Sequence, residues 1–382
     1  MKSFAVDVAT RQFSKKGEDI CGDAVKVSQT PDSTIIVMSD GLGSGVKANV
    51  LATLTVERAS GLFEGDLSLR ETIETLVATL PVCKWRDIAY STFTIVRIYD
   101  TGQVTVAEYD SPTLLYLKSG IRPRPIHGAE QTICDKTIRE SYFRMTPGDV
   151  IMLYTDGIVY AGVGEGLAMG WQEDGVCSYV AETAPSMAGD SSRLASSVVD
   201  RALQHWAYRP GDDGTVTCAR YRKAQLATLL TGPPGERGDV AKMMRDFTTS
   251  KGAKIVCGGT SSHIVADFLK QDLDMDERYI DSDLPPVAKI KGVDLVTEGI
   301  LTLSRATEYL SRGRPAGKTD AACALLDQLM SADGIKFMVG TARNPAHQNT
   351  GLPDSIFLRR TVVENLAAQL RAQGKETEFV YY

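Results

Sequence analysis

Short apolar runs separated by turn residues dominate the first 222 residues of the chain. Residues 35–38 (Ile-Ile-Val-Met) and 150–154 (Val-Ile-Met-Leu-Tyr) are continuously apolar, which is typical of strands buried on both faces. Residues 92–99 and 104–109 flank an Asp-Thr-Gly turn and predict a hairpin. Residues 111–117 are predicted to continue this meander. The pattern favours antiparallel sheets over βαβ units.

Three segments of this first half have helical spacing instead. Apolar positions recur every three to four residues in 46–62, 67–80 and 191–206. Helices inserted between predicted antiparallel strands indicate an α+β fold. We therefore expect a two-sheet β-sandwich flanked by helices.

The pattern changes near Leu226, where strand, turn and helix begin to alternate. Such alternation predicts a smaller α/β domain with a parallel sheet, so we place a first domain at 1–222 and a second at 225–382. Strands are expected at 227–230, 253–257, 334–339 and 378–380, and helices at 239–250, 262–269, 295–310, 320–330 and 354–372.

Composition excludes several classes of function. The formal net charge is −6 and no Lys/Arg-rich stripe is present, which argues against nucleic acid as a partner. The sequence contains no run long enough to span a membrane and no apolar signal core at its start, so we expect no membrane association. Seven cysteines without a Cys-x-x-Cys pair fit reduced thiols and a cytoplasmic location. Four histidines without metal-ligand spacing weigh against zinc and serine-histidine chemistry.

Four acidic motifs next to glycine are the candidate chemistry. They are Gly22-Asp23, Asp40-Gly41, Asp156-Gly157 and Asp212-Asp213-Gly214, and two of them close the apolar runs described above. A single Asp-Gly pair after a strand is more often only a turn. Several strand-end carboxylates together, however, are the oxygen ligands that Mg²⁺ and Mn²⁺ prefer.

The order and spacing of these motifs resemble the metal-dependent protein phosphatase family, with the protein phosphatase 2C-like fold, and in particular its bacterial SpoIIE-type branch. The resemblance covers residues 1–222. It implies a two-ion Mn²⁺ or Mg²⁺ site in which Asp40 bridges the ions, with the Gly41 carbonyl beside it. Asp23, Asp156 and Asp212 would complete the site, while Asp213 would hold a water or a neighbouring ligand.

The resemblance also has implications beyond the metal site, and it has one departure. In the SpoIIE-type branch, the helices corresponding to residues 46–80 are associated with partner recognition and switching. The family's Asn-Ala-Gly-His-like turn after the hairpin is replaced here by Tyr109-Asp110-Ser111-Pro112. Residues 41–45 could also be a phosphate cradle, but they lack the Lys-Ser/Thr ending of a nucleotide P-loop.

The second domain contains weaker candidates. Gly258, Gly259, Thr260 and Ser261 follow a predicted strand and precede a predicted helix, so they form either a small-ligand site or only a tight turn with a Ser/Thr N-cap. Residues 231–235 are a glycine and proline turn that could face the same edge. Residues 272–277 are predicted to be a solvated acidic loop, and residues 341–349 are a further polar candidate.

The favoured hypothesis is a Mn²⁺- or Mg²⁺-dependent serine/threonine phosphatase regulated by the second domain. By resemblance, its partner would be a phosphorylated protein, such as an anti-sigma-factor antagonist or a similar small signalling protein, and a homodimer is left open. One alternative is a catalytically silent scaffold stabilised by metal. Another is a second domain that binds a nucleotide or small ligand and has its own activity.

Overall fold

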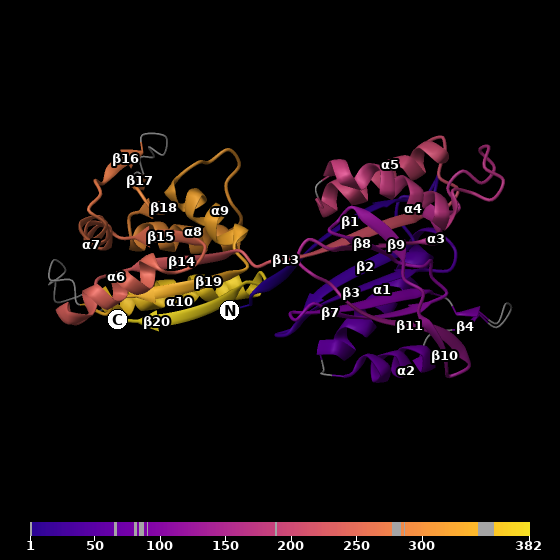
Figure 1. Ribbon diagram of the computed structural model, residues 1–382, viewed down its shortest axis with the longest axis horizontal. Coiled ribbons are helices and arrows are strands. Elements are labelled where there is room, and N and C mark those ends of the chain that lie inside the picture. Colours follow the sequence, from indigo (N-terminus) through magenta and orange to yellow (C-terminus); the bar gives the residue numbers. More distant parts are fainter. Residues whose placement is uncertain are drawn as a thin grey trace. The chain divides into compact units, whose positions relative to one another are not determined.

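The structure is a computed structural model that describes residues 2–64, 67–79, 82–83, 88–89, 91–187, 189–276, 284–285, 287–342 and 355–382. The chain forms two compact units (Figure 1). One spans Phe4–Lys223, and the other spans Ala224–Tyr382 together with the residues up to Ser3.

Two antiparallel sheets form the first unit. The six-stranded sheet has the order β10-β11-β7-β6-β3-β2, and the five-stranded sheet has the order β1-β13-β12-β8-β9. The strands of the first sheet are β2 (Asp23–Gln29), β3 (Ser33–Asp40), β6 (Phe93–Tyr99), β7 (Gln103–Tyr109), β10 (Ala129–Ile133) and β11 (Lys136–Arg144). Those of the second are β1 (Phe4–Phe13), β8 (Leu115–Lys118), β9 (Arg122–Pro125), β12 (Val150–Tyr154) and β13 (Gly214–Lys223), while β4 (Val82–Cys83) and β5 (Ile88–Ala89) pair separately.

Helices cover the outer face of each sheet. Along β3, Ile35 and Val37 pack with α1 (Gly45–Glu64) and α2 (Leu69–Thr79), while Ile36 and Met38 belong to the core between the sheets. The five-stranded sheet packs against α3 (Asp156–Val159), α4 (Gln172–Thr183) and α5 (Ser191–His205); the short 3-10 helix η1 (Ala184–Met187) joins α4 to α5 (Figure 1). The expected β-sandwich flanked by helices is confirmed. The run at 35–38 is continuously apolar because both of its faces are buried.

The chain changes sheets after β7, where the sequence predicted a continuing meander. β8 pairs with β12 of the other sheet, while the neighbours of β7 are β6 and β11. Asp110 has φ +51°, a left-handed conformation, and Pro112 lacks the N–H that a ladder would need. The prediction for residues 111–117 was therefore wrong, and this corner lies beside the candidate site.

The second unit has a seven-stranded sheet with the order β16-β17-β18-β15-β14-β19-β20. Its strands are β14 (Leu226–Thr231), β15 (Ala253–Cys257), β16 (Asp274–Asp276), β17 (Val287–Ile290), β18 (Val293–Thr297), β19 (Gly334–Val339) and β20 (Glu376–Tyr381). The pairs from β18 to β20 are parallel, as expected, and β16–β17–β18 pair antiparallel at one edge.

Alternate residues of the central strands face opposite layers of helices. Leu229 and Ile255 pack with α8 (Ile300–Arg312), α9 (Ala321–Ser331) and α10 (Ser355–Ala372). Leu230 and Val256 pack with α6 (Val240–Thr248), which follows the 3-10 helix η2 (Arg237–Asp239), and with α7 (Gly259–Leu269). The unit is thus an α/β/α sandwich, in agreement with the predicted class.

Two local predictions for this unit were wrong. The helix expected at 295–310 begins only at Ile300, because Leu295 and Val296 lie in β18, and a short apolar run does not distinguish a strand from a helix. The acidic loop expected at 272–277 contains β16, in which Asp274 lies opposite Lys289 of β17. An acidic residue facing a basic one across two strands favours pairing.

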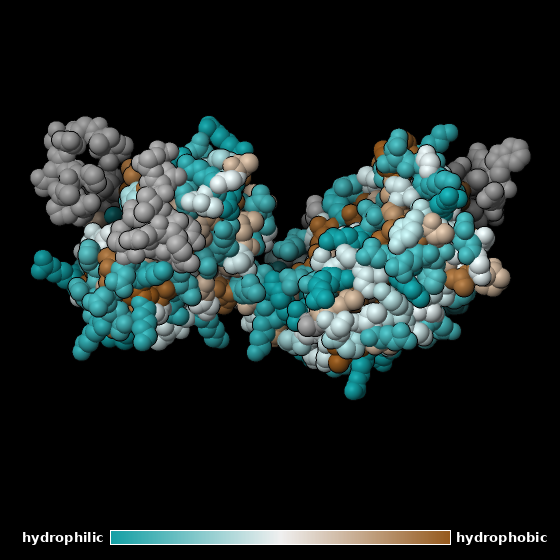
Figure 2. Space-filling view, turned by 90° about the horizontal axis from the view of Figure 1, so that it is seen from above, coloured by the Kyte–Doolittle hydropathy of each residue, from teal (hydrophilic) through white to brown (hydrophobic). Residues whose placement is uncertain are grey.

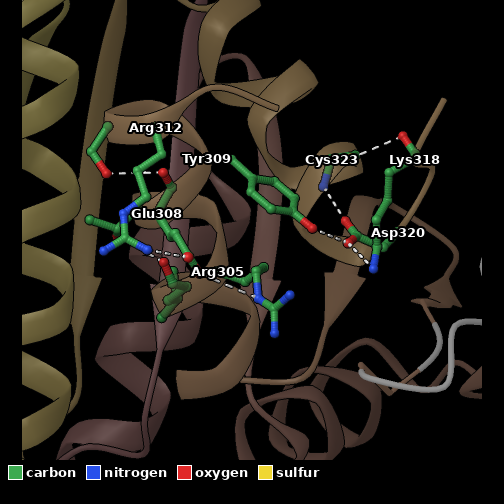
Figure 3. Close-up of polar contacts among 10 residues, drawn as sticks. Arg305, Glu308, Tyr309, Arg312, Lys318, Asp320 and Cys323 are labelled. Atoms are coloured by element: carbon green, nitrogen blue, oxygen red, sulfur yellow. Dashed lines mark hydrogen bonds and ion pairs between the residues drawn. The ribbon is translucent and has the colours of Figure 1, made fainter. Parts of the chain in front are cut away.

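A buried carboxylate links α8 to α9 (Figure 3). Asp320 is the N-cap of α9 and is fully buried; it accepts hydrogen bonds from the Cys323 backbone N–H at 2.8 Å and from the Tyr309 hydroxyl at 2.8 Å. The Lys318 ammonium lies 4.0 Å away. Figure 3 also shows the Cys323 thiol donating a hydrogen bond to the Lys318 carbonyl, and the ion pair of Arg312 with Glu308 on α8.

We expect Asp320→Ala to destabilise this unit by about 2 to 4 kcal/mol, because it removes the cap and leaves a buried hydroxyl without its acceptor. Urea unfolding followed by circular dichroism measures the change. Asp327→Ala is the matched control on the same helix, since Asp327 is exposed and makes only a surface ion pair with Arg314. It should change stability by less than about 1 kcal/mol. Equal losses in both variants would contradict this role for Asp320.

Polar residues cover most of the face seen in Figure 2, and apolar residues occur there in separate patches. Within the described part of the chain, no helix combines the length and apolar character of a membrane span.

Candidate metal centre

Strand pairing brings the acidic motifs together in two groups. Asp23 begins β2, Asp40 ends β3, and the two are direct partners in the antiparallel register. In the other sheet, one residue separates Asp156 from the end of β12, and one residue separates Asp212 from the start of β13. These two strands are neighbours, and Tyr154 of β12 pairs with Val216 of β13. Each sheet therefore presents carboxylates at the ends of two neighbouring strands.

Two threonines join the groups across the sandwich. The Asp23 Oδ2 atom accepts hydrogen bonds from the Thr155 hydroxyl at 2.9 Å and from the Thr215 hydroxyl at 2.6 Å. The Thr155 hydroxyl oxygen also accepts a hydrogen bond from the Thr215 backbone N–H at 2.9 Å. Asp23, from the six-stranded sheet, is thereby fixed to both strands that carry the other acids.

The pKa values of the acids show how closely they are crowded. Burial raises the pKa of Asp40 to about 9, and the charges of Asp23, Asp156 and Asp212 add to the effect. Burial likewise raises the pKa of Asp23 to about 6, against the two threonine hydrogen bonds that lower it. The pKa values of Asp156 and Asp212 are also raised, in both cases mainly by burial. Four acids that resist ionising together call for a countercharge.

Unpaired carboxylate oxygen atoms indicate that a bound metal cation supplies this countercharge. The Asp23 Oδ1 and Asp213 Oδ2 atoms are buried and have no hydrogen-bond partner among the residues that the structure describes. In the described residues, no three or more acidic, histidine or cysteine side chains lie in an arrangement that could by itself hold a metal ion. An ion that keeps several waters does not need one, because Mg²⁺ is usually bound through one or two carboxylates at a time. The donor set therefore fits hydrated Mg²⁺ or Mn²⁺.

The two aspartates of the last motif have different surroundings. Asp213 is only 4% exposed, and its Oδ1 atom accepts a hydrogen bond from the Lys15 backbone N–H at 2.9 Å. Asp212 is half-buried, and after burial the charge of Asp156 contributes most to its raised pKa. Both residues therefore border the acid cluster: the charge of Asp156 acts on Asp212, while Asp213 holds the loop at Lys15 through its Oδ1 atom and raises the pKa of Asp23 through its charge. The assignment of Asp212 as the ligand and Asp213 as its support stays a prediction.

Gly41 allows the start of α1 to pack against the end of β3. A Cβ atom at this position would lie 2.0 Å from the Ala48 carbonyl oxygen, which is backbone and cannot move independently. The glycine is therefore needed for close packing of the backbone. The expected place of the Gly41 carbonyl beside the metal site stays a prediction.

We expect Gly41→Ala to cost about 1 to 3 kcal/mol of stability and to weaken divalent metal binding, because α1 and the Asp40 backbone must separate. Thermal unfolding with and without Mn²⁺ measures both effects. Gly61→Ala in α1 is the control, since no atom of the described residues outside its own helical turn lies within 4 Å of the added Cβ atom. It should be neutral or stabilise by up to about 1 kcal/mol. Identical behaviour of the two variants would contradict the packing role of Gly41.

A cavity of about 390 Å³ opens beside Asp40 and Asp156. Its lining includes Asp110, Arg139 and Glu173, none of which the sequence singled out as functional. One signal in the sequence pointed to Asp110: residues 109–112 differ from the turn that the family has at this place, and the chain changes sheets there. Arg139 and Glu173 come from β11 and α4, and no local motif identifies them.

The candidate residues of the second unit occupy a strand-to-helix turn. Gly258 has φ +127° and is the N-cap of α7 without a side-chain cap, so the expected Ser/Thr N-cap is not formed. Gly259, Thr260 and Ser261 lie in the first turn of α7, and the buried Ser261 hydroxyl has no hydrogen-bond partner in the described ranges of the chain. A ligand at this turn stays a prediction. Residues 343–349 of the other polar candidate lie outside the described residues.

The fold and the acid cluster together define a protein phosphatase 2C-like phosphatase fold. The family model of Stage II sporulation protein E (SpoIIE) matches residues 30–222, about half of the chain, and the chain belongs to this family. No curated protein matches its sequence.

Among solved structures, the chain is similar to the PP2C phosphatase domain with a regulatory-domain fragment of SpoIIE from Bacillus subtilis, with 16% identity and a TM-score of 0.51. The match covers 58% of this chain and 65% of that one, so the protein spans just under two thirds of that relative's length. The SiaA-PP2C domain of Pseudomonas aeruginosa has 20% identity and a TM-score of 0.45, with 55% of this chain and 85% of that one covered. RsbX in complex with magnesium has 16% identity and a TM-score of 0.42, with 58% and 100% covered.

Proposed function

We propose that the protein is a Mn²⁺- or Mg²⁺-dependent phosphatase that hydrolyses phosphoserine or phosphothreonine on a protein substrate. One observation carries this proposal: carboxylates from both sheets converge beside a cavity, and buried carboxylate oxygens of this acid cluster lack hydrogen-bond partners in the described part of the chain. Membership of the SpoIIE family supports the class of reaction.

Asp40, Asp23, Asp156 and Asp212 would hold two ions, with the Gly41 carbonyl beside Asp40. Divalent cations bound in this way supply an activated water nucleophile and offset the charge of the phosphate. Thr155 and Thr215 hold Asp23 in place, and Asp213 anchors the Lys15 loop behind Asp212. The Asp40–Asp156 side of the cavity would receive the phosphoryl group.

The physiological substrate that we propose is a small phosphorylated signalling protein of the anti-sigma-factor-antagonist kind. We assign regulation to the α/β unit, which would sense a ligand or bind a partner. Support for these two assignments comes from the family resemblance and from the presence of a separate α/β/α unit in the same chain.

Hydrolysis of p-nitrophenyl phosphate and of a phosphoserine peptide tests the proposed activity. The purified full chain should turn over both substrates with added Mn²⁺, and excess EDTA should abolish turnover. Metal binding in calorimetry without turnover on either substrate would contradict the proposal and favour a silent, metal-stabilised scaffold.

A further inference from the structure

The cavity beside the acid cluster has a distinctive charge pattern. Its acidic lining consists of Asp40, Asp156, Asp110 and Glu173. Arg139 is the single Lys or Arg side chain among the described residues that line it. A substrate carrying a doubly charged phosphate would therefore meet one fixed cation of the protein in this part of the cavity.

Arg139 is held by two neighbours on the cavity wall. On β11 it lies directly opposite Glu108 of β7, and its Nε atom forms an ion pair with the Glu108 Oε2 atom at 3.5 Å. Its Nη2 atom donates a hydrogen bond to the Ser111 carbonyl at the corner between the sheets. The Glu108 carboxylate is fully buried and is itself fixed by the Leu114 backbone N–H at 2.9 Å. The orientation of the guanidinium is thus set before a ligand arrives.

These contacts leave hydrogen-bonding capacity unused. A guanidinium has five N–H donors, and the bond to Ser111 is the one hydrogen bond that Arg139 makes within the described residues. The ion pair between the Arg139 Nε atom and the Glu108 Oε2 atom is long, at 3.5 Å, and neither atom has a well-formed hydrogen bond within the described residues. About a third of the Arg139 side chain, 32%, remains exposed. A purely structural arginine beside a buried carboxylate would be expected to saturate it with short paired bonds.

We propose that Arg139 binds the phosphoryl group of the substrate, so that the phosphate lies between this guanidinium and the Asp40–Asp156 edge of the cavity. The planar fork of an arginine matches two oxygen atoms of a phosphate, which a lysine ammonium does not. This assignment rests on the proposed phosphatase function, because it takes a phosphate as the group that enters the cavity.

Calorimetry with inorganic phosphate tests the assignment independently of catalysis. The full chain is saturated with Mn²⁺ and titrated with phosphate, and KM for p-nitrophenyl phosphate is measured in parallel. Arg139→Gln should raise the phosphate Kd and KM by about tenfold to a hundredfold, the effect of losing a charge-assisted contact. Arg139→Lys, which keeps the charge but not the fork, should raise both by at least about threefold. Mn²⁺ affinity should stay unchanged in both variants.

Arg144→Gln is the matched control, because Arg144 is an exposed residue on the same strand and does not line the cavity. It should leave Kd and KM unchanged. A folded Arg139→Gln variant whose phosphate Kd and KM stay within twofold of the original would overturn the assignment. If Arg139→Gln does not fold, Arg139→Lys decides by the same criterion.

The two proposals fail separately in this design. If the original protein turns over substrate but its phosphate Kd does not depend on Arg139, the role of Arg139 is rejected and the proposed phosphatase activity stands. If phosphate binding depends on Arg139 but no substrate is turned over, the proposed phosphatase activity is rejected and the phosphate site at Arg139 stands.

Discussion

Asp40→Asn is expected to lower kcat for phosphoester hydrolysis roughly a thousandfold or more, because a divalent site contributes several kcal/mol to such reactions and each 1.36 kcal/mol is tenfold in rate. Burial raises the pKa of Asp40, and the charges of Asp23, Asp156 and Asp212 add to this effect, so Asp40 lies close to all three of these acids. Asparagine keeps the shape of the side chain but not the charge. Stopped assays with p-nitrophenyl phosphate and Mn²⁺ measure the loss.

The same variant should remain folded and should lose the Mn²⁺-induced rise in melting temperature. Asp135→Asn is a suitable control, since Asp135 lies in the exposed turn between β10 and β11. It should retain activity and the response to metal. Full activity of Asp40→Asn would contradict the assignment of Asp40 as a metal ligand.

Stability of the metal-free protein is expected to fall as the pH rises from about 4 to about 9. Folding raises the pKa of Asp40 from 3.8 to about 9 and that of Asp23 from 3.8 to about 6. A raised acid pKa means that the folded state binds the proton more tightly than the unfolded state. The contribution of these groups is therefore fully present below their ordinary pKa values and is lost as the pH passes their raised ones.

Urea unfolding in EDTA at pH 6 and pH 9 isolates this effect when Asp40→Asn is compared with the original protein. The variant should gain free energy of unfolding relative to the original as the pH rises, seen as a higher urea midpoint with an unchanged slope. Added Mn²⁺ should stabilise the original protein at pH 9 and leave the variant unchanged, since a ligand stabilises only the state that binds it. A stability difference that does not change with pH would contradict the crowding of these acids.

The sequence predicted those parts of the fold that depend on local pattern. Buried strands such as 253–257 and 334–339 match β15 and β19 residue for residue, because a turn residue bounds each apolar run. Asp40 was placed correctly at a strand end for the same reason. The helix at 191–206 was also predicted to within a residue, since its apolar stripe and the Asp190 cap are local signals.

Long-range register could not be predicted in this way. The contact of Asp23 with Thr155 and Thr215 depends on how two sheets meet, and the pairing of Glu108 with Arg139 depends on which strand follows β7 in space. The sequence suggested a meander after β7, whereas the chain turns at Asp110 into the other sheet. Arg139 therefore had no signal in the sequence, although it lies in the same cavity as Asp40.

The most direct test is anomalous diffraction from crystals of the full chain grown with Mn²⁺. The account predicts manganese density beside Asp40, with Asp23, Asp156 and Asp212 around it and Asp213 outside the coordination sphere. Saturating Mn²⁺ that leaves no density at Asp40, or that binds only elsewhere in the chain, would contradict it.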